Sequence, residues 1–276
     1  SVKTLSSIAH SRFPGAFWRL KKVIVSGEAG KVCLAQIDSF WWRGHSYYDL
    51  WWRGTWEKEA GGCTLNHAVH HIDAIQWMLG FPRAVVSMIT NASHDNAEVE
   101  DISAAIFKYD SGALTQLTAS VVHHGEDQKM VIQGEKARIS APWDKYASIS
   151  APNGFPIDAR DTARENQLED IYQSIPKLNY TLHTGQIDNF LTALETGTAP
   201  LIDGVQGKRS LELIAAIYKS AITRSIVSLP LAPNDPFYQT GGLVSLAPHF
   251  YEKSASVENF ANEDAIPLDK NMDQGA

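Results

Sequence analysis

A run of short, β-rich segments separated by turns fills the middle of the chain and limits the fold more than any other feature. These segments cover residues 84–90, 102–109, 113–122, 129–133 and 137–140. Asp110-Ser111-Gly112 and Gly134-Glu135-Lys136 have the composition of tight turns between neighbouring segments. Strands joined by short turns run antiparallel, so the sequence predicts a large, mostly antiparallel sheet.

The predicted strand at 113–122 has two different faces. Leu114, Gln116, Thr118 and Ser120 make one face small and polar, while Ala113, Thr115, Leu117, Ala119 and Val121 make the other apolar. We expect helices at 183–195 and 208–225 to cover the apolar face. The open face is expected to bind another copy of the chain, as a dimer or tetramer. The predicted fold class is α/β of the α+β kind, with helices on one face of the sheet.

Other elements flank this region. A proline in the first turn and a glycine stop predict a helix over residues 14–26, and β-branched and aromatic residues predict a strand over 32–41. The aromatic stretch that continues to Trp56 is expected to be a long ordered loop, followed by a helix over 64–79. A weaker helix is predicted at 161–175.

Composition excludes several classes of function. The 276 residues carry a net charge of −7, which argues against nucleic acid as a partner. No apolar run is long enough to span a membrane, and the first residues do not resemble a secretory signal. The two cysteines form no CxxC pair, which favours a cytoplasmic location. Neither a G-x-G tripeptide nor a P-loop motif occurs, so the chain shows no phosphate cradle of its own.

The segment between Gly61 and Gly80 carries the most informative pattern. At about 100° per residue, Asn66, His70, Asp73 and Trp77 fall on one polar stripe beside a buried arc. Histidine suits proton transfer near neutral pH, and a carboxylate three residues on can fix its tautomer. His70 is equally well explained as a hydrogen-bonded core histidine. The Gly61-Gly62 pair would let the main chain approach a ligand closely.

Two further histidines of this segment offer a different chemistry. His67 and His71 are four residues apart, a spacing at which both can reach one metal ion. The glutamate of an H-E-x-x-H motif is missing, so solvated side chains are the better explanation and no metal residue is predicted. Cys63 is expected to be structural, because no base is evident for it.

The aromatic loop between Trp41 and Trp56 is a candidate sugar site. Its Trp and Tyr rings can stack on the apolar faces of pyranoses or cyclitols, while Arg43, Arg53 and Tyr48 can bind hydroxyl groups. Oligomer interfaces favour the same residue types, so interface burial is an equal alternative.

Three stretches of the chain resemble one family. Residues 52–82 read WRGTWEKEAGGCTLNHAVHHIDAIQWMLGFP, which is similar to the signature of the glucose–fructose oxidoreductase/inositol dehydrogenase (Gfo/Idh/MocA) family. In that signature a Gly-rich turn precedes (Asp/Asn)-x-x-x-His-x-x-Asp, here Asn66, His70 and Asp73. Residues 11–32 and 183–231 resemble the family's interdomain connection and its closing pair of helices.

The resemblance covers about residues 8–231 and implies an NAD(P)-dependent dehydrogenase of sugars or cyclitols. His70 would take part in acid–base chemistry, and Asn66 would contact substrate hydroxyls where many members carry Asp. Asparagine cannot ionise, so Asn66 is not expected to relay a proton. The expected substrate-binding residues are Arg12, Tyr48, Trp52, Arg53 and Asp73.

The cofactor motifs of the family lie upstream of the first residue of this sequence. The resemblance therefore implies that residues 1–12 are a remnant of the last Rossmann strand, 13–233 the substrate and oligomerisation domain, and 234–276 a polar tail. No cofactor-binding residue is expected in this chain, and NAD or NADP would bind only to the intact parent.

These observations predict a substrate-binding and oligomerisation domain of an NAD(P)-dependent oxidoreductase that acts on the CH–OH group of a sugar or cyclitol. The chain alone is expected to be inactive. A stand-alone, non-catalytic domain for sugar binding or assembly is the first alternative. A metal-dependent hydrolase that uses His67 and His71 is the second.

Overall fold

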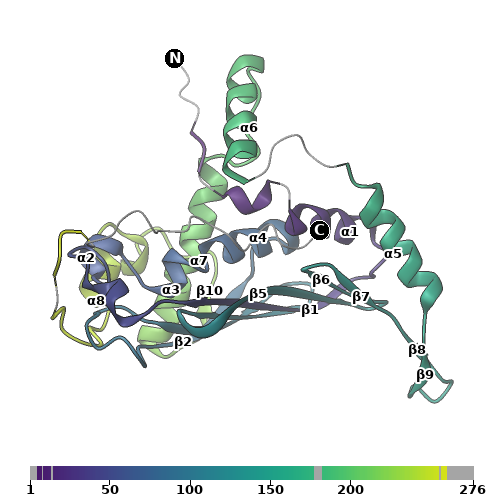
Figure 1. The fold of residues 1–276 in the computed structure, drawn as a ribbon, viewed down its shortest axis with the longest axis horizontal. Helices are drawn as coiled ribbons and strands as arrows, with labels where there is room; N and C mark the ends of the chain where they lie inside the picture. The colour runs from purple at the N-terminus through teal and green to yellow at the C-terminus, as the bar shows by residue number, and fades with distance from the viewer. Residues whose placement is uncertain (1–4, 8, 14, 177–181, 255, 260–276) are drawn as a thin grey trace.

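The computed structural model describes residues 5–7, 9–13, 15–176, 182–254 and 256–259, which build around one eight-stranded sheet (Figure 1). The strand order is β10-β2-β3-β4-β1-β5-β6-β7. The strands are β1 (Val32–Trp42), β2 (Ala84–Thr90), β3 (Ile102–Lys108), β4 (Leu114–Ser120), β5 (Val122–Gly134), β6 (Arg138–Ala141), β7 (Asp144–Tyr146) and β10 (Val227–Ser228). A separate hairpin pairs β8 (Ser148–Ser150) with β9 (Pro156–Arg160).

The prediction of a large, mostly antiparallel sheet is confirmed. Of the neighbours in this sheet, β1 and β4 run parallel and the other pairs run antiparallel. In β4, Thr115, Leu117 and Ala119 are buried, whereas Leu114 and Gln116 are exposed. The predicted alternation of faces is therefore present, and the apolar face is the one that the helices cover.

The helices that cover the sheet come from three distant parts of the chain. They are α1 (Ala16–Ser26), α4 (Val69–Leu79) and α7 (Gly204–Thr223); α1 and α4 lie along one side of the sheet in Figure 1, and α7 contacts β2. Leu20, Ile72 and Ile217 bring one apolar side chain from each helix into the core. There they join Phe107 and Leu117 of the sheet, so one core connects helices that are distant in the sequence.

The remaining helices are short or peripheral. They are α2 (Trp56–Glu59), α3 (Cys63–Asn66), α5 (Thr162–Ser174), α6 (Leu182–Thr196), α8 (Gly242–Leu246) and the 3₁₀ helices η1 (His10–Arg12), η2 (His45–Asp49) and η3 (Pro236–Tyr238). None of the helices in the described ranges is long and apolar enough to cross a membrane.

Much of the segment predicted as a polar tail lies against the rest of the chain. Phe237 of η3 is buried, the main chain of Phe250 donates to Glu98, and Val257 donates to Asp49. The indole of Trp56 donates to the Pro248 carbonyl at 2.9 Å. Within the described residues, this segment therefore braces the aromatic loop. Residues 255 and 260–276 lie outside the described residues.

The single helix predicted over 64–79 is wrong, because the chain breaks it at His67 and Ala68. The amides of both residues donate to the Cys63 carbonyl, at 3.2 and 2.9 Å, which ends α3 before α4 begins. The break turns His67 and His71 inward, where they are 7% and 1% exposed. Our expectation that these histidines are solvated is therefore wrong.

The glycine pair before α3 approaches protein rather than open space. A Cβ atom on Gly62 would lie 1.9 Å from the carbonyl oxygen of Glu100, and one on Gly61 would lie 2.2 Å from the hydroxyl of Tyr218. The Glu100 carboxylate also accepts from the amides of Gly62 and Thr64, at 3.1 and 3.0 Å. The groups that approach the glycine pair closely are therefore Glu100, just before β3, and Tyr218 of α7, in place of the ligand that we predicted.

Replacing His71 by phenylalanine should make stability less dependent on pH. Burial lowers the pKa of both His67 and His71 to about 3 from 6.5. Between these values the unfolded chain binds more protons, so the free energy of unfolding falls as the pH drops, by about 1.4 kcal/mol per pH unit for each histidine. In urea unfolding at pH 7 and pH 5, the wild type should lose about 2 kcal/mol more than His71→Phe.

The adjacent core residue Ile72 provides the control. Ile72→Val removes a buried methyl group and no titratable group, so it should lower stability by about 1 kcal/mol equally at both pH values. An unchanged pH dependence in His71→Phe would contradict the assignment of a neutral, buried imidazole.

Candidate active site

Asn66 and His70 lie where α3 gives way to α4. Asn66 is exposed and its side-chain amide donates to the Gly61 carbonyl at 2.7 Å, while His70 is half-buried in the first turn of α4. Because of the helix break, the two residues belong to different helical segments and do not form the continuous stripe predicted with Trp77. An amide and an imidazole at this position can together serve as hydrogen-bond donors and acceptors for hydroxyl groups.

The end of β1 and the loop after it bring five large side chains together beside this helix start. We call Trp41, Arg43, Tyr47, Trp52 and Arg53 the aromatic wall. The guanidinium of Arg43 lies 5.4 Å from the ring centres of both Trp41 and Tyr47. That of Arg53 lies 4.1 Å from Tyr47 and 4.2 Å from Trp52. Alternating rings and guanidinium groups make a stiff stacked layer.

His67 connects the aromatic wall to the helix that carries His70. Its ring centre lies 5.7 Å from that of Trp41 and 6.1 Å from that of Tyr47. Burial is the main cause of its low pKa, and the positive charges of Arg43 and Arg53 act in the same direction. His67 therefore acts as a neutral spacer between the wall and α4.

Both arginines of the wall are paired with carboxylates. Arg53 binds Glu59 at 3.0 Å and also donates to the hydroxyl of Tyr47. Burial raises the pKa of Glu59, while its bonds with Gly54 and Arg53 oppose that shift. Arg43 lies 3.1 Å from Glu126. These pairs leave the wall with little net charge, as suits stacking on a neutral ring.

Tyr48, predicted to bind substrate, lies beneath the wall instead of on it. The side chain is 1% exposed, and its ring meets those of Tyr47 and His94 edge to face, at 5.0 and 4.8 Å. Burial raises the pKa of its hydroxyl well above the usual value. Tyr48 supports the loop from the core side.

Arg12 and Asp73, two other predicted substrate residues, bind each other. The guanidinium nitrogens Nε and Nη2 of Arg12 each lie 2.7 Å from one carboxylate oxygen of Asp73. Ser210 of α7 donates to the same carboxylate at 2.8 Å, and both members of the pair are buried. Their polar atoms join η1, α4 and α7, so the pair holds the helix that presents His70.

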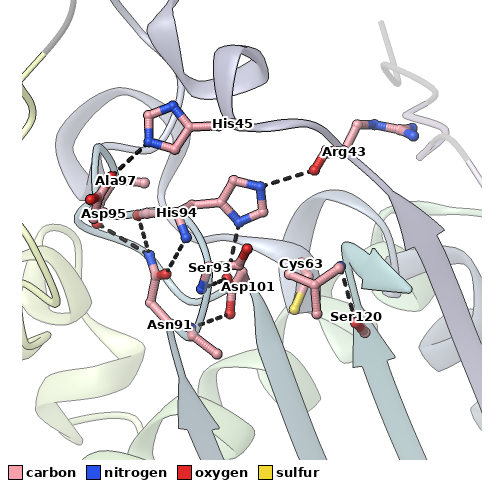
Figure 2. A network of polar contacts seen from close by, with 12 residues as sticks. Arg43, His45, Cys63, Asn91, Ser93, His94, Asp95, Ala97, Asp101 and Ser120 are labelled. Carbon is pink, nitrogen blue, oxygen red and sulfur yellow. Dashed lines mark hydrogen bonds and ion pairs between the residues drawn. The ribbon is translucent and has the colours of Figure 1, made fainter. Parts of the chain in front are cut away.

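The loop between β2 and β3, for which no role was predicted, contacts the wall at Arg43 (Figure 2). His94 lies 2.9 Å from Asp101 and 3.0 Å from the main-chain oxygen of Arg43. Asn96 donates to Asp49 and to the carbonyl of His45. The sequence contains a pattern that could have indicated this loop. The segment 91–101 is too long and too polar for a hairpin turn, and it contains His94, Asn96 and Asp101.

In the part of the chain that the structure describes, no three His, Cys, Asp or Glu side chains are arranged so that they could hold a metal ion. Burial raises the pKa of the Cys63 thiol well above its usual value, in line with a structural cysteine. The sequence contains no G-x-G turn of the kind that holds a pyrophosphate.

The chain is similar in sequence to a known dehydrogenase. The 276-residue chain is 24% identical over 225 residues to inositol 2-dehydrogenase of Rhizobium meliloti (strain 1021), a match that covers 79% of this chain and 63% of that protein. The chain thus spans less than two thirds of the length of this relative.

Two crystal structures of WlbA dehydrogenases in complex with NADH and UDP-GlcNAcA share the fold. The enzyme from Chromobacterium violaceum has 27% identity and a TM-score of 0.68, and that from Bordetella pertussis 25% and 0.65. Each match covers 83% of this chain and 64% of the other.

A family model described as the GFO/IDH/MocA C-terminal domain matches residues 17–140. This range contains Asn66, His70 and the whole aromatic wall. Residues 17–140 of the chain are therefore similar to the GFO/IDH/MocA C-terminal domain.

Proposed function

We propose that this chain is the substrate-binding part of an NAD(P)-dependent oxidoreductase that acts on the CH–OH group of a sugar or cyclitol. The observation that carries the proposal is the position of His70 and Asn66 at a helix start beside the aromatic wall. The family match and the relatives support the reaction class. One relative is an inositol 2-dehydrogenase, and two structural neighbours hold NADH with UDP-GlcNAcA.

Each part of the site would contribute one function. The wall would stack on the apolar face of the ring, as aromatic side chains do on pyranoses. The amide of Asn66 would bind hydroxyl groups and orient the ring. The imidazole of His70 would take the hydroxyl proton as the carbon is oxidised, and return it in the reverse direction.

Nicotinamide would supply or accept the hydride when bound. We assign no residue of this chain to holding it, because no turn of the sequence fits a pyrophosphate.

Loss of the imidazole should affect turnover far more than substrate binding. The assay is the NAD(P)-linked oxidation of a sugar or cyclitol by a protein that contains this chain. We expect His70→Ala to lower kcat about 100-fold or more, because general acid–base catalysis contributes a factor of that size. Steady-state kinetics across pH would measure the effect. A variant that keeps the wild-type rate would contradict the role of His70.

Loss of one wall tryptophan should weaken sugar binding to this chain. Titration calorimetry with myo-inositol and neutral pyranoses should detect binding, and Trp52→Ala should weaken it about tenfold by removing a stacking surface. Trp51→Ala is the matched control, because this neighbouring residue is half exposed and lies outside the wall.

The same titration tests the cofactor assignment. Binding of NAD(H) or NADP(H) at micromolar concentration would contradict the view that this chain holds no cofactor residue. Equal affinities in Trp51→Ala and Trp52→Ala would contradict a sugar site at the wall.

We also propose that the uncovered face of the sheet binds a second copy of the chain. Val86, Met88, Ile106 and Leu114 are exposed on that face, and Met88 is 79% exposed. Adjacent exposed apolar side chains of this kind favour a protein interface. The expected assembly is a dimer or tetramer.

A charge at the centre of this face should dissociate the assembly. Ile106 lies opposite Val86 and Gln116 on the neighbouring strands, so Ile106→Glu should convert the oligomer to a monomer in light scattering. Val25→Glu places the same charge on the exposed side of α1 and should leave the mass unchanged. A monomeric wild type would refute the interface.

A further inference from the structure

The loop between β2 and β3 contains a buried pair, His94 and Asp101, that contacts the aromatic wall. His94 and Asp101 are 1% and 0% exposed, and the ring atom Nδ1 lies 2.9 Å from the carboxylate. The other ring nitrogen, Nε2, lies 3.0 Å from the carbonyl oxygen of Arg43. The two contacts place the ring between two chain segments more than forty residues apart (Figure 2).

Each ring nitrogen of His94 faces an oxygen atom. The main-chain oxygen of Arg43 can only accept a hydrogen bond. The Asp101 carboxylate also accepts from the amides of Ala92 and Ser93, at 2.9 and 2.8 Å, and such bonds favour its ionised form. Both ring nitrogens of His94 therefore face hydrogen-bond acceptors, an arrangement that a ring with hydrogen on both nitrogens satisfies.

The main chain of Arg43 is the point at which the His94 ring contacts the wall. Arg43 directly follows β1, and its amide donates to the Val121 carbonyl at 2.8 Å. Its side chain then stacks on Trp41 and Tyr47. A shift of this carbonyl would therefore move the first guanidinium layer of the wall.

Neighbouring contacts fix the rest of the same loop. Asn96 binds the carbonyl of His45 at 3.1 Å and the carboxylate of Asp49 at 2.8 Å, and the Glu98 amide donates to the Gly54 carbonyl at 2.7 Å. The rings of Tyr48 and His45 lie 4.8 and 6.5 Å from that of His94. The 91–101 loop thus supports residues 43–54 along their length.

We propose that His94 is a positioning residue: its imidazolium, held by Asp101, fixes the Arg43 main chain and so presets the aromatic wall before a ligand arrives. The functional meaning rests on the proposed sugar site, whereas the positioning itself does not. A doubly protonated ring is required, because a neutral imidazole or an amide would turn a lone pair or an oxygen toward one of the two acceptors.

Hydrogen–deuterium exchange with mass spectrometry on the 276-residue chain tests the positioning. His94→Gln and Asp101→Asn should each raise exchange in residues 43–54 about tenfold, while the strands of the sheet keep their protection. Ser87→Ala is the matched control, since it removes a buried hydrogen bond to Ile217 between β2 and α7. It should not affect residues 43–54 selectively. Uniform loss of protection in the His94 and Asp101 variants would overturn the proposal.

Nuclear magnetic resonance of the wild type gives a readout that does not depend on a stable variant. At neutral pH the His94 ring should show hydrogen on both nitrogens, with each proton protected from solvent. A single ring N–H would overturn the proposal.

Titration of His94→Gln with myo-inositol separates the two proposals. Weaker binding by about tenfold, with Trp51→Ala unaffected, would support both. Absence of sugar binding to the wild type, together with localised exchange at residues 43–54, would refute the sugar site and leave the positioning role intact. Wild-type affinity and wild-type exchange in His94→Gln would refute the positioning role alone.

Discussion

Two consecutive buried carboxylates, Glu100 and Asp101, hold the two halves of the candidate site together. They lie just before β3, and neither is exposed. Glu100 accepts from the amides before and within α3 and from the hydroxyl of Tyr218 at 2.8 Å, which fixes the helix start. Asp101 fixes the 91–101 loop beneath the aromatic wall. Neither carboxylate could be buried without these donors, because an unpaired charge in the core is too costly.

The position of β1 in the sheet explains why the wall meets the helix that carries His70. β1 lies between β4 and β5, parallel to the first and antiparallel to the second. Its last residues, including Trp41, therefore emerge at the same edge of the sheet as the end of β4. There they reach His67, at the break between α3 and α4. Residues distant in sequence meet because a strand from the N-terminal part is inserted between strands from the middle.

The sequence predicted the parts of this structure that depend on local pattern. Alternation along residues 113–121 predicted the two faces of β4, and the turn residues at 110–112 predicted the hairpin before it. The stop at Gly80 predicted the end of α4, because a glycine with φ of 86° can end a helix without strain. These features depend on neighbouring residues, so one sequence was enough.

The features that the sequence could not provide depend on distant partners. The helix break at His67 follows the glycine turn that Glu100 holds in place. The amides of His67 and Ala68 both donate to the Cys63 carbonyl there, and a partner thirty-eight residues from Gly62 in the sequence is not visible in the local pattern. Tyr48 has the composition of a binding residue, yet its burial depends on His94, more than forty residues away. Arg12 and Asp73 carry charges typical of a substrate site, and only the fold shows that they pair with each other.

That last pair determines which way α4 faces, and therefore where His70 lies. Asp73 binds Arg12 and Ser210, while His71 packs edge to face against Phe17 at 5.6 Å. A rotation of α4 by one residue would remove Asp73 from both donors and leave the Arg12 guanidinium buried without its carboxylate, at a cost of about 3–5 kcal/mol. The charged pair thus helps to select one rotation of a helix whose buried face is mostly apolar. In that rotation His70 is half-buried, three residues after His67, which contacts the wall.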